Sequence, residues 1–210
     1  DNNLIMKAYR LLKEEFNLPP INIHLHKAIP MGAGLGGGSA DAAFMLKMLN
    51  DEFNLGLSAQ ELEKRASKLG ADCAFFIENK QILGKGIGNI FEPTTINLAG
   101  YHIVLIKPEV HVSTAEAYGG CKPQRWDVPL EEAVKHPIAE WKNCVFNDFE
   151  KTVFIAHPEL AKIKNMLYNK GAIYAAMSGS GSTIYGIFDK EIEQNIATDI
   201  KSSIYYLTLK

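Results

Sequence analysis

Residues 29–43 read Ile-Pro-Met-Gly-Ala-Gly-Leu-Gly-Gly-Gly-Ser-Ala-Asp-Ala-Ala, a glycine-rich loop followed by small helix-forming residues. The residues before it alternate between apolar and polar from Ile21 to Leu25, which predicts a strand. The residues after it, 40–49, are mostly good helix formers. The sequence therefore predicts a strand, a glycine loop and a helix in succession.

The glycine loop is suited to hold an anion. Five glycines between positions 32 and 38, followed by Ser39 at a helix start, remove the side chains that would keep a ligand away from backbone N–H groups. The helix dipole adds partial positive charge at the same place. A flexible Gly/Ser linker is the alternative, but such linkers rarely separate a well-patterned strand from a helix. The loop therefore predicts phosphate binding.

Spacing separates three known classes of phosphate loop. The P-loop requires a lysine that this loop lacks, and the glycine loop of protein kinases is followed by a V-A-I-K strand that is absent here. Gly32, Gly34 and Gly37 do satisfy G-x-G-x-x-G. The dinucleotide fold, however, needs a second strand ending in an acidic residue about 20 positions further on. A dinucleotide-dependent oxidoreductase survives only if a strand exists near residue 55.

Helix signals surround the loop in the first half of the chain. An apolar stripe over residues 3–16 predicts a surface helix that Pro19 and Pro20 terminate. Ser58 and Glu61 form a capping box for a second helix, which we expect to end at Gly70 in a left-handed C-cap. Asp72 follows that end and precedes the apolar run 73–77.

The second half of the chain predicts an α+β domain with helices on one face of an antiparallel sheet. Glycines and Pro93 interrupt the chain before residue 100, and we place a domain boundary between residues 97 and 98, giving domains 1–97 and 98–210. Ser113 and Glu116 form a second capping box. The expected strands are 101–106, 173–177, 183–188 and 204–209, and the expected helices are 131–134, 147–156, 158–170 (closed by Gly171) and 190–202.

Composition excludes several kinds of partner. The formal net charge of the 210 residues is −2, and the basic residues are scattered, so we expect no nucleic acid and no anionic membrane as a partner. The longest apolar stretches are too short for a membrane-spanning helix. Three cysteines without C-x-x-C spacing argue against a disulfide framework and a zinc site, and favour a cytoplasmic location.

Two further kinds of site are also excluded. His24 and His26 share one strand face without an identifiable third ligand, so we expect no resident metal held by the protein. Ser180 lacks the G-x-S-x-G elbow and an assignable His/Asp pair of a hydrolase.

Three segments together resemble one enzyme family. Residues 30–39 resemble the P-x-x-x-G-L-[GS]-S-S motif of the GHMP kinase superfamily, which includes galactokinase, homoserine kinase, mevalonate kinase and phosphomevalonate kinase. Residues 69–72, Leu-Gly-Ala-Asp, resemble the segment that supplies the catalytic aspartate, and residues 177–181, Met-Ser-Gly-Ser-Gly, resemble the third glycine motif. The three motifs stand in the family's order.

The resemblance implies a fold and an activity. The expected fold is α+β, with a ribosomal-S5-like N-terminal domain that binds ATP and a ferredoxin-like C-terminal domain. Further segments, at residues 1–5, 84–88, 112–118 and 147–150, resemble the branch that phosphorylates the 2-hydroxyl of 4-diphosphocytidyl-2-C-methyl-D-erythritol in non-mevalonate isoprenoid biosynthesis. The alternatives are a sister kinase acting on homoserine, mevalonate or a sugar, and an inactive nucleotide-binding fragment.

The resemblance also implies site residues, with ATP and Mg²⁺ as cofactors and a small molecule as the partner. Asp72 is the expected catalytic base, although spacing alone also fits a cap after Gly70. Asp41 is expected in the first helical turn, where it could contact a metal or complement the dipole, and we favour the dipole role. The expected ATP-binding residues are Pro30, Gly32, Ala33, Gly34, Leu35, Gly36, Gly37, Gly38 and Ser39, with Asn3 and Lys27 beside the adenine. The expected substrate-binding residues are Thr114, Tyr118, Ser178, Gly179, Ser180 and Gly181.

Some of these assignments have simpler readings. Tyr118 could be a partly buried packing residue, and residues 178–181 a tight hairpin. Family members also carry a lysine-bearing strand before the position of Asp1, so we expect the N-terminal domain of this chain to be incomplete. The oligomeric state stays open.

Overall fold

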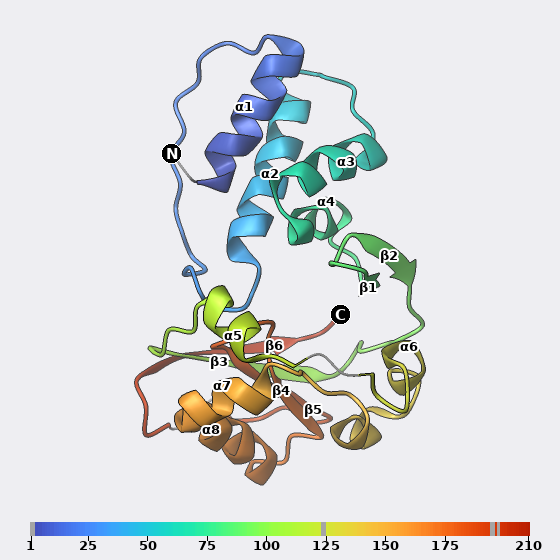
Figure 1. The fold of residues 1–210 in the computed structure, drawn as a ribbon, viewed down its shortest axis with the longest axis vertical. Helices are drawn as coiled ribbons and strands as arrows, with labels where there is room; N and C mark the ends of the chain where they lie inside the picture. Colours follow the sequence, from blue (N-terminus) through green and yellow to red (C-terminus); the bar gives the residue numbers. More distant parts are fainter. Residues whose placement is uncertain (1–2, 123–124, 194–195, 197) are drawn as a thin grey trace. The chain divides into compact units, whose positions relative to one another are not determined.

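The structure is a computed structural model that describes residues 3–122, 125–193, 196 and 198–210 (Figure 1). The chain forms two compact units. The N-terminal unit comprises Asp1–Met31 and Gly36–Thr94, and the C-terminal unit comprises Gly32–Leu35 and Thr95–Lys210. The chain therefore passes from one unit to the other in the middle of the glycine loop.

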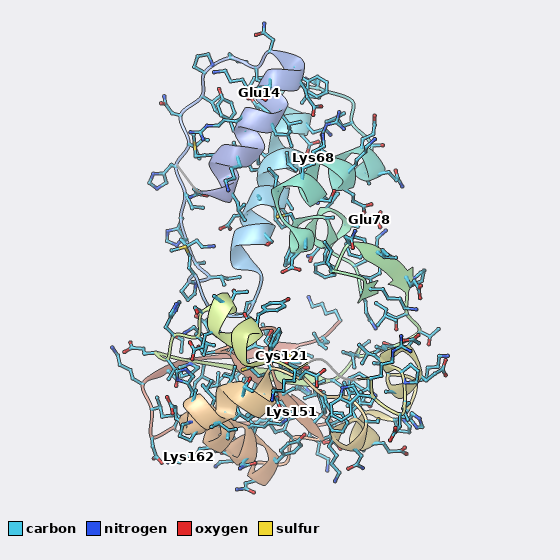
Figure 2. All side chains as sticks on the ribbon, in the orientation of Figure 1. Glu14, Lys68, Glu78, Cys121, Lys151 and Lys162 are labelled. Atoms are coloured by element: carbon cyan, nitrogen blue, oxygen red, sulfur yellow. The ribbon has the colours of Figure 1, made fainter. Side chains whose placement is uncertain are left out.

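The N-terminal unit consists of helices and one small hairpin. Its elements are α1 (Leu4–Phe16), α2 (Gly37–Glu52), α3 (Ala59–Leu69), the 3₁₀ turn η1 (Ala71–Cys73), α4 (Phe75–Glu78), and the antiparallel strands β1 (Ile82–Lys85) and β2 (Ile90–Pro93). Leu12 of α1 and Leu46 and Leu49 of α2 are fully buried between the helices. Truncating any of these leucines to alanine costs about 2–5 kcal/mol. Charged residues such as Glu14 and Lys68 are exposed (Figure 2).

The ends of α1 and α3 show how these helices are fixed. The predicted helix 3–16 is confirmed as α1, and it ends at Asn17, which adopts the left-handed conformation (φ 50°) before either proline. The capping box of α3 is confirmed, with Ser58 and Glu61 hydrogen-bonded reciprocally. The prediction for Gly70 is wrong, because its φ of 178° is extended rather than left-handed. The chain leaves α3 straight into the turn that carries Asp72.

The predicted strand at residues 21–25 is wrong. The segment is extended and unpaired, and the two-stranded sheet β1–β2 is the sheet of this unit within the described residues. The alternating pattern still has a physical effect, since Ile21 and Ile23 pack against the helical core while His24 is exposed. An alternating pattern indicates which side chains face a core. It does not show that a neighbouring strand is present to form backbone hydrogen bonds.

The C-terminal unit is built on a four-stranded antiparallel sheet with the order β4-β5-β3-β6. Its strands are β3 (His102–Pro108), β4 (Tyr174–Met177), β5 (Ile184–Phe188) and β6 (Ser202–Thr208), and its helices are α5 (Thr114–Gly120), α6 (Leu130–Ala133), the 3₁₀ helix η2 (Ile138–Asn143), α7 (Glu150–Ala156) and α8 (Pro158–Asn169). All four predicted strands are confirmed. The first and last strands lie side by side, and the first also pairs with the third, as in ferredoxin-like domains.

Both faces of this sheet are covered. Val104, Met177 and Ile184 pack with residues of α5, α7 and α8 on one face. Tyr174 and Ile187 pack on the other face against Trp141 of η2. The α+β class is confirmed, but the expectation that helices cover one face alone is wrong, because a 3₁₀ helix covers the second.

Two helix predictions for this unit differ from the structure. The described part of residues 190–202 is not helical, and its last residue already belongs to β6. The hydroxyls of Thr198 and Ser202 both donate to the carbonyl of Ile200, and such local bonds compete with a helix. The helix predicted over 147–156 begins later, at Glu150.

The second capping box forms only in part. Ser113 caps α5 by accepting from the N–H of Glu116, as predicted. The Glu116 carboxylate hydrogen-bonds to His157, 2.8 Å away, instead of returning to the helix start. This bond holds the pKa of Glu116 below its usual value.

In the part of the chain that the structure describes, every helix is too short or too polar to span a membrane.

Candidate active site

The start of α2 presents unpaired backbone donors. Gly36 precedes the helix in the left-handed conformation (φ 63°), and no side chain caps it. The first intrahelical bond runs from the N–H of Ala40 to the carbonyl of Gly36. Within the described residues, the N–H groups of Gly37, Gly38 and Ser39 therefore stay available at the positive end of a 16-residue helix. Such an end binds phosphate.

Asp72 lies in the wall of a cavity of about 250 Å³ in the N-terminal unit. The lining residues come from the N-cap of α2, the turn η1, α4 and the β1–β2 hairpin, and they are Gly36, Asp72, Phe75, Phe76, Ile82, Gly84, Gly88 and Phe91. The Asp72 side chain is exposed, and a Cβ on Gly88 would stand 3.4 Å from its Oδ1. The cavity thus combines a carboxylate with the N-terminus of a helix.

Cys73 follows Asp72 in the chain, and its side chain is fully buried. Burial raises the pKa of the thiol, so Cys73 is a neutral packing residue rather than a nucleophile.

Lys27 and Asp41 form an ion pair that their spacing in the sequence does not predict. A Cβ on Gly37 would lie 3.3 Å from Lys27 Nζ, which puts the ammonium group beside the start of α2. The prediction that Asp41 complements the dipole from the first turn is wrong, because α2 begins at Gly37 and Asp41 lies beyond that turn. Asn3 caps α1 by accepting from the N–H of Ile5 at 3.0 Å.

In the C-terminal unit, residues 32–35 pack against the turn between β4 and β5. The Ser178 hydroxyl donates to the carbonyl of Gly34 at 2.7 Å, and the N–H of Thr183 donates to the carbonyl of Ala33 at 3.2 Å. Gly34 has a φ of 71°, and a Cβ on it would stand 2.2 Å from the carbonyl oxygen of Ser178. Only glycine permits this close approach.

Asn147 binds the same turn and Glu150 binds the end of β4 that leads into it, and sequence reasoning gave neither residue a role. The Asn147 amide donates to the carbonyls of Met177 and Gly179, both at 2.8 Å. Glu150 accepts from the N–H of Met177 at 2.7 Å and pairs with Lys164. The available signal was their place in residues 147–150, a segment that carried part of the resemblance.

The predicted substrate residues of α5 lie on its open side. Thr114 is exposed, and Tyr118 is 65% exposed with its ring edge-to-face against Phe149, the centroids 4.8 Å apart. Tyr118 therefore packs through one side of its ring and leaves most of its surface exposed. Its ring keeps a surface on which a flat group can stack.

The predicted site residues thus form separate groups. Gly36 and Asp72 both line the cavity of the N-terminal unit. Gly37, Gly38 and Ser39 come directly after Gly36 and form the first turn of α2. Gly34 meets the 178–181 turn in the C-terminal unit, with Ser180 partly exposed there, and Gly32 lies against the ring of His111. Pro30 is exposed and Leu35 is partly buried. Thr114 and Tyr118 stand on α5.

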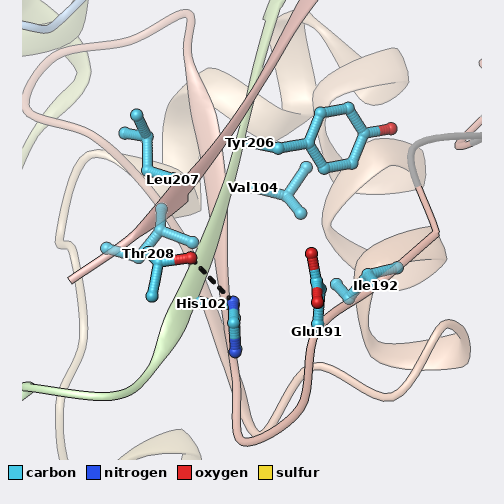
Figure 3. Close-up of a pocket in the computed structure, with 8 residues that line it drawn as sticks. His102, Val104, Glu191, Ile192, Tyr206, Leu207 and Thr208 are labelled. Carbon is cyan, nitrogen blue, oxygen red and sulfur yellow. Dashed lines mark hydrogen bonds between the residues drawn. The ribbon is translucent and has the colours of Figure 1, made fainter.

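A smaller cavity of about 60 Å³ lies beside the β3–β6 pair of the C-terminal unit (Figure 3). His102 Nδ1 lies 3.1 Å from the hydroxyl of Thr208 there, and Glu191 and Tyr206 complete its polar wall. None of the predicted site residues lines it, so it is not part of the candidate active site.

Two family models match the chain. The model of the GHMP kinase N-terminal domain matches residues 3–80, and the model of the GHMP kinase C-terminal domain matches residues 130–205. The chain belongs to the GHMP kinase family. A GHMP kinase transfers a phosphoryl group from ATP to a small molecule, so ATP use and enzymatic activity follow from this membership.

Relatives within the family share much of the sequence. The 4-diphosphocytidyl-2-C-methyl-D-erythritol kinase of Bacteroides fragilis is 55% identical over 208 residues, which cover 99% of this GHMP kinase and 76% of the relative. A crystal structure of 4-(cytidine 5'-diphospho)-2C-methyl-D-erythritol kinase matches with a TM-score of 0.74 and 31% identity, over 88% of this chain and 68% of that one. The predicted family and fold class are confirmed.

A homoserine kinase from Cytophaga hutchinsonii has the same fold at 19% identity, with a TM-score of 0.73 over 99% of this chain and 76% of that one.

The dinucleotide-dependent alternative is excluded, because residues 53–58 form a turn and a loop between α2 and α3 and contain no strand.

Proposed function

We propose that this GHMP kinase transfers the γ-phosphoryl group of ATP to the 2-hydroxyl of 4-diphosphocytidyl-2-C-methyl-D-erythritol, a step of non-mevalonate isoprenoid biosynthesis. The observation that carries the proposal is the 55% identity to the kinase of that name over 99% of the chain. The cavity that pairs Asp72 with the start of α2 supports the chemistry.

Asp72 is the proposed general base. Its exposed carboxylate can accept the proton of the attacking hydroxyl while the N–H groups at the start of α2 stabilise the phosphates. The apolar rings of Phe75 and Phe76 line the same cavity and reduce the water around the reacting groups. Positioning and charge stabilisation are most of what phosphoryl transfer asks of a protein.

The ATP-binding assignment follows the glycine loop. Residues 36–39 offer backbone donors at the helix start, and Pro30 and residues 32–35 make up the rest of the loop. We assign Asn3 and Lys27 to the adenine side. Their side chains cap α1 and neutralise Asp41, so the contacts proposed with the base are those of the backbone near them.

Mg²⁺ fits the oxygen groups that the cavity region offers. The Ser39 hydroxyl would offer a hard oxygen ligand of the type that Mg²⁺ prefers, and the Asp72 carboxylate stays free as the base. When bound with ATP, the ion neutralises charge on the phosphates. Asp41 is not among the proposed ligands, because Lys27 already neutralises it.

The C-terminal unit is proposed to hold the acceptor. The exposed ring of Tyr118 can stack on a cytosine, and Thr114 adds a hydroxyl on the same helix. The turn 178–181 offers the N–H groups of Gly179 and Ser180, which have no hydrogen-bond partner within the described part of the chain.

The proposal also includes the division into domains 1–97 and 98–210 and a cytoplasmic location.

The test is acceptor-dependent release of ADP from MgATP. It uses the 210-residue chain and a form extended at its N-terminus by the lysine-bearing family segment, with diphosphocytidyl methylerythritol compared against homoserine, mevalonate and galactose. Turnover that requires the cytidine-bearing acceptor supports the proposal. Turnover with another acceptor identifies a sister kinase instead, and ADP binding without turnover in either form identifies a nucleotide-binding protein.

The first variant is Asp72→Asn, which keeps the shape of the side chain and removes the base. We expect kcat to fall about 10³-fold, within the range that a general base contributes. Glu78→Gln is the matched control, because Glu78 ends α4 outside the cavity and pairs with Lys80. If Asp72→Asn keeps more than a tenth of the activity, Asp72 is not the base.

A further inference from the structure

We propose that Asn147 is a positioning residue for ATP. Its side-chain amide holds the turn 178–181 in the one place that fits Gly34, and so fixes the first half of the phosphate-binding loop. The inference rests on the proposed function, because it takes the glycine loop as the site of the ATP phosphates.

The contacts of Asn147 determine how its amide is oriented. Nδ2 donates its two hydrogens to the carbonyls of Met177 and Gly179, each at 2.8 Å, and Oδ1 accepts from the N–H of Phe149 at 3.0 Å. Exchanging the nitrogen and the oxygen would point an acceptor at two carbonyl oxygens. The position therefore requires an amide.

The two carbonyls that Asn147 binds lie on either side of Ser178. Ser178 in turn donates through its hydroxyl to the carbonyl of Gly34 at 2.7 Å. The fit is tight in the other direction as well, since a Cβ on Gly34 would stand 2.7 Å from the carbonyl oxygen of Gly181. A turn that moves by a fraction of an ångström has to move Gly34 with it.

Glu150 binds the backbone before the turn and does not bind the turn itself. Its carboxylate accepts from the N–H of Met177, the last residue of β4, and Lys164 neutralises it. Glu150 thus anchors the end of the strand, whereas Asn147 reaches past the strand to Gly179. The turn itself is held by the neutral amide.

The decisive variant is Asn147→Asp, which has almost the same shape. It keeps the acceptor for Phe149 and replaces two donor contacts with repulsion between a carboxylate and two carbonyls. We expect KM for ATP to rise about 10- to 100-fold, the equivalent of losing two hydrogen bonds, with a smaller change in kcat.

Asn50→Asp is the matched control. Asn50 also uses both ends of its amide on backbone, donating to the carbonyl of Leu57 at 3.3 Å and accepting from the N–H of Leu57 at 2.9 Å. It holds the connection between α2 and α3, which carries no candidate site residue. We expect this variant to unfold at a lower temperature while its KM for ATP stays within twofold of the parent value.

Two readouts keep this inference separable from the proposed function: KM for ATP in the turnover assay, and the Kd for ADP by calorimetry, which needs no acceptor. A loss of ADP affinity in Asn147→Asp supports the positioning role even if the acceptor is another molecule. The role is refuted if the variant behaves as Asn50→Asp does, or if the parent chain binds no ADP. Should Asn147→Asp not fold, Ser178→Ala removes the next link, and an unchanged Kd for ADP in that variant refutes the role.

Discussion

The two halves of the glycine loop use the same residue for different reasons. Gly34 in the first half is surrounded by backbone, with the carbonyl oxygens of Ser178 and Gly181 where a Cβ would be. Gly36 in the second half faces the ring of Phe76, a side chain that can turn aside. The halves also belong to different compact units.

Glycine is therefore required for two different structural reasons in this loop, although the sequence shows a single glycine-rich run. The first half needs glycine for close approach between chain segments, and the second half needs it to start α2 from a left-handed residue with free N–H groups. Substituting one glycine at a time by alanine measures how strictly each position requires glycine, because the new Cβ would contact different atoms at each position.

The largest effect is expected for Gly34→Ala. The new Cβ would stand 2.2 Å from a backbone oxygen, and alanine is strained at a φ of 71°. We expect a loss of about 3 kcal/mol or more in the free energy of unfolding, seen as a fall of about 6 °C or more in the unfolding midpoint. A midpoint within 2 °C of the parent would mean that the turn yields easily and that the first half is not tightly packed.

Gly36→Ala should have an intermediate effect. Its φ of 63° strains alanine by about 1–2 kcal/mol, while Phe76 can rotate away from the new methyl group. Calorimetric unfolding measures the cost, and ADP titration shows whether the cavity beside Asp72 is altered. A cost as large as that of Gly34→Ala would remove the distinction between the two halves.

Gly38→Ala should have the smallest effect, with the opposite sign. Gly38 lies inside α2, and the nearest atom to a new Cβ is 3.8 Å away, an ordinary contact. Alanine at a helical position gains about 0.5–1 kcal/mol over glycine, so the unfolding midpoint should rise. A destabilised variant would show that this glycine, too, is required sterically.

Local patterns in the sequence were enough for most elements. The stripe of α1, the capping box of α3 and the four strands of the C-terminal sheet each follow from neighbouring residues. The three glycine and aspartate motifs were enough for the family. These features depend on short-range chemistry that a single segment expresses.

Several of the errors arose where a distant residue decides the outcome, whereas the helix predicted over 190–202 failed because of local hydrogen bonds to the Ile200 carbonyl. The segment at residues 21–25 has the pattern of a strand without a partner, and Glu116 leaves its capping role for His157, 41 residues further along the chain. The pair of Lys27 with Asp41 and the contacts of Asn147 with the turn are likewise tertiary. Spacing carries no information about such partners, so the positioning residues of a site are harder to predict than its motifs.

The unpaired segment at residues 21–29 has a consequence for isotope exchange. Its N–H groups donate no backbone hydrogen bond within the described part of the chain, so they should exchange with D₂O without any opening of the protein. The amides of β3, held between β5 and β6, should exchange only when the sheet opens. One exchange time course would therefore label the stretch that leads into the glycine loop within its first points, while the central strand remained protonated.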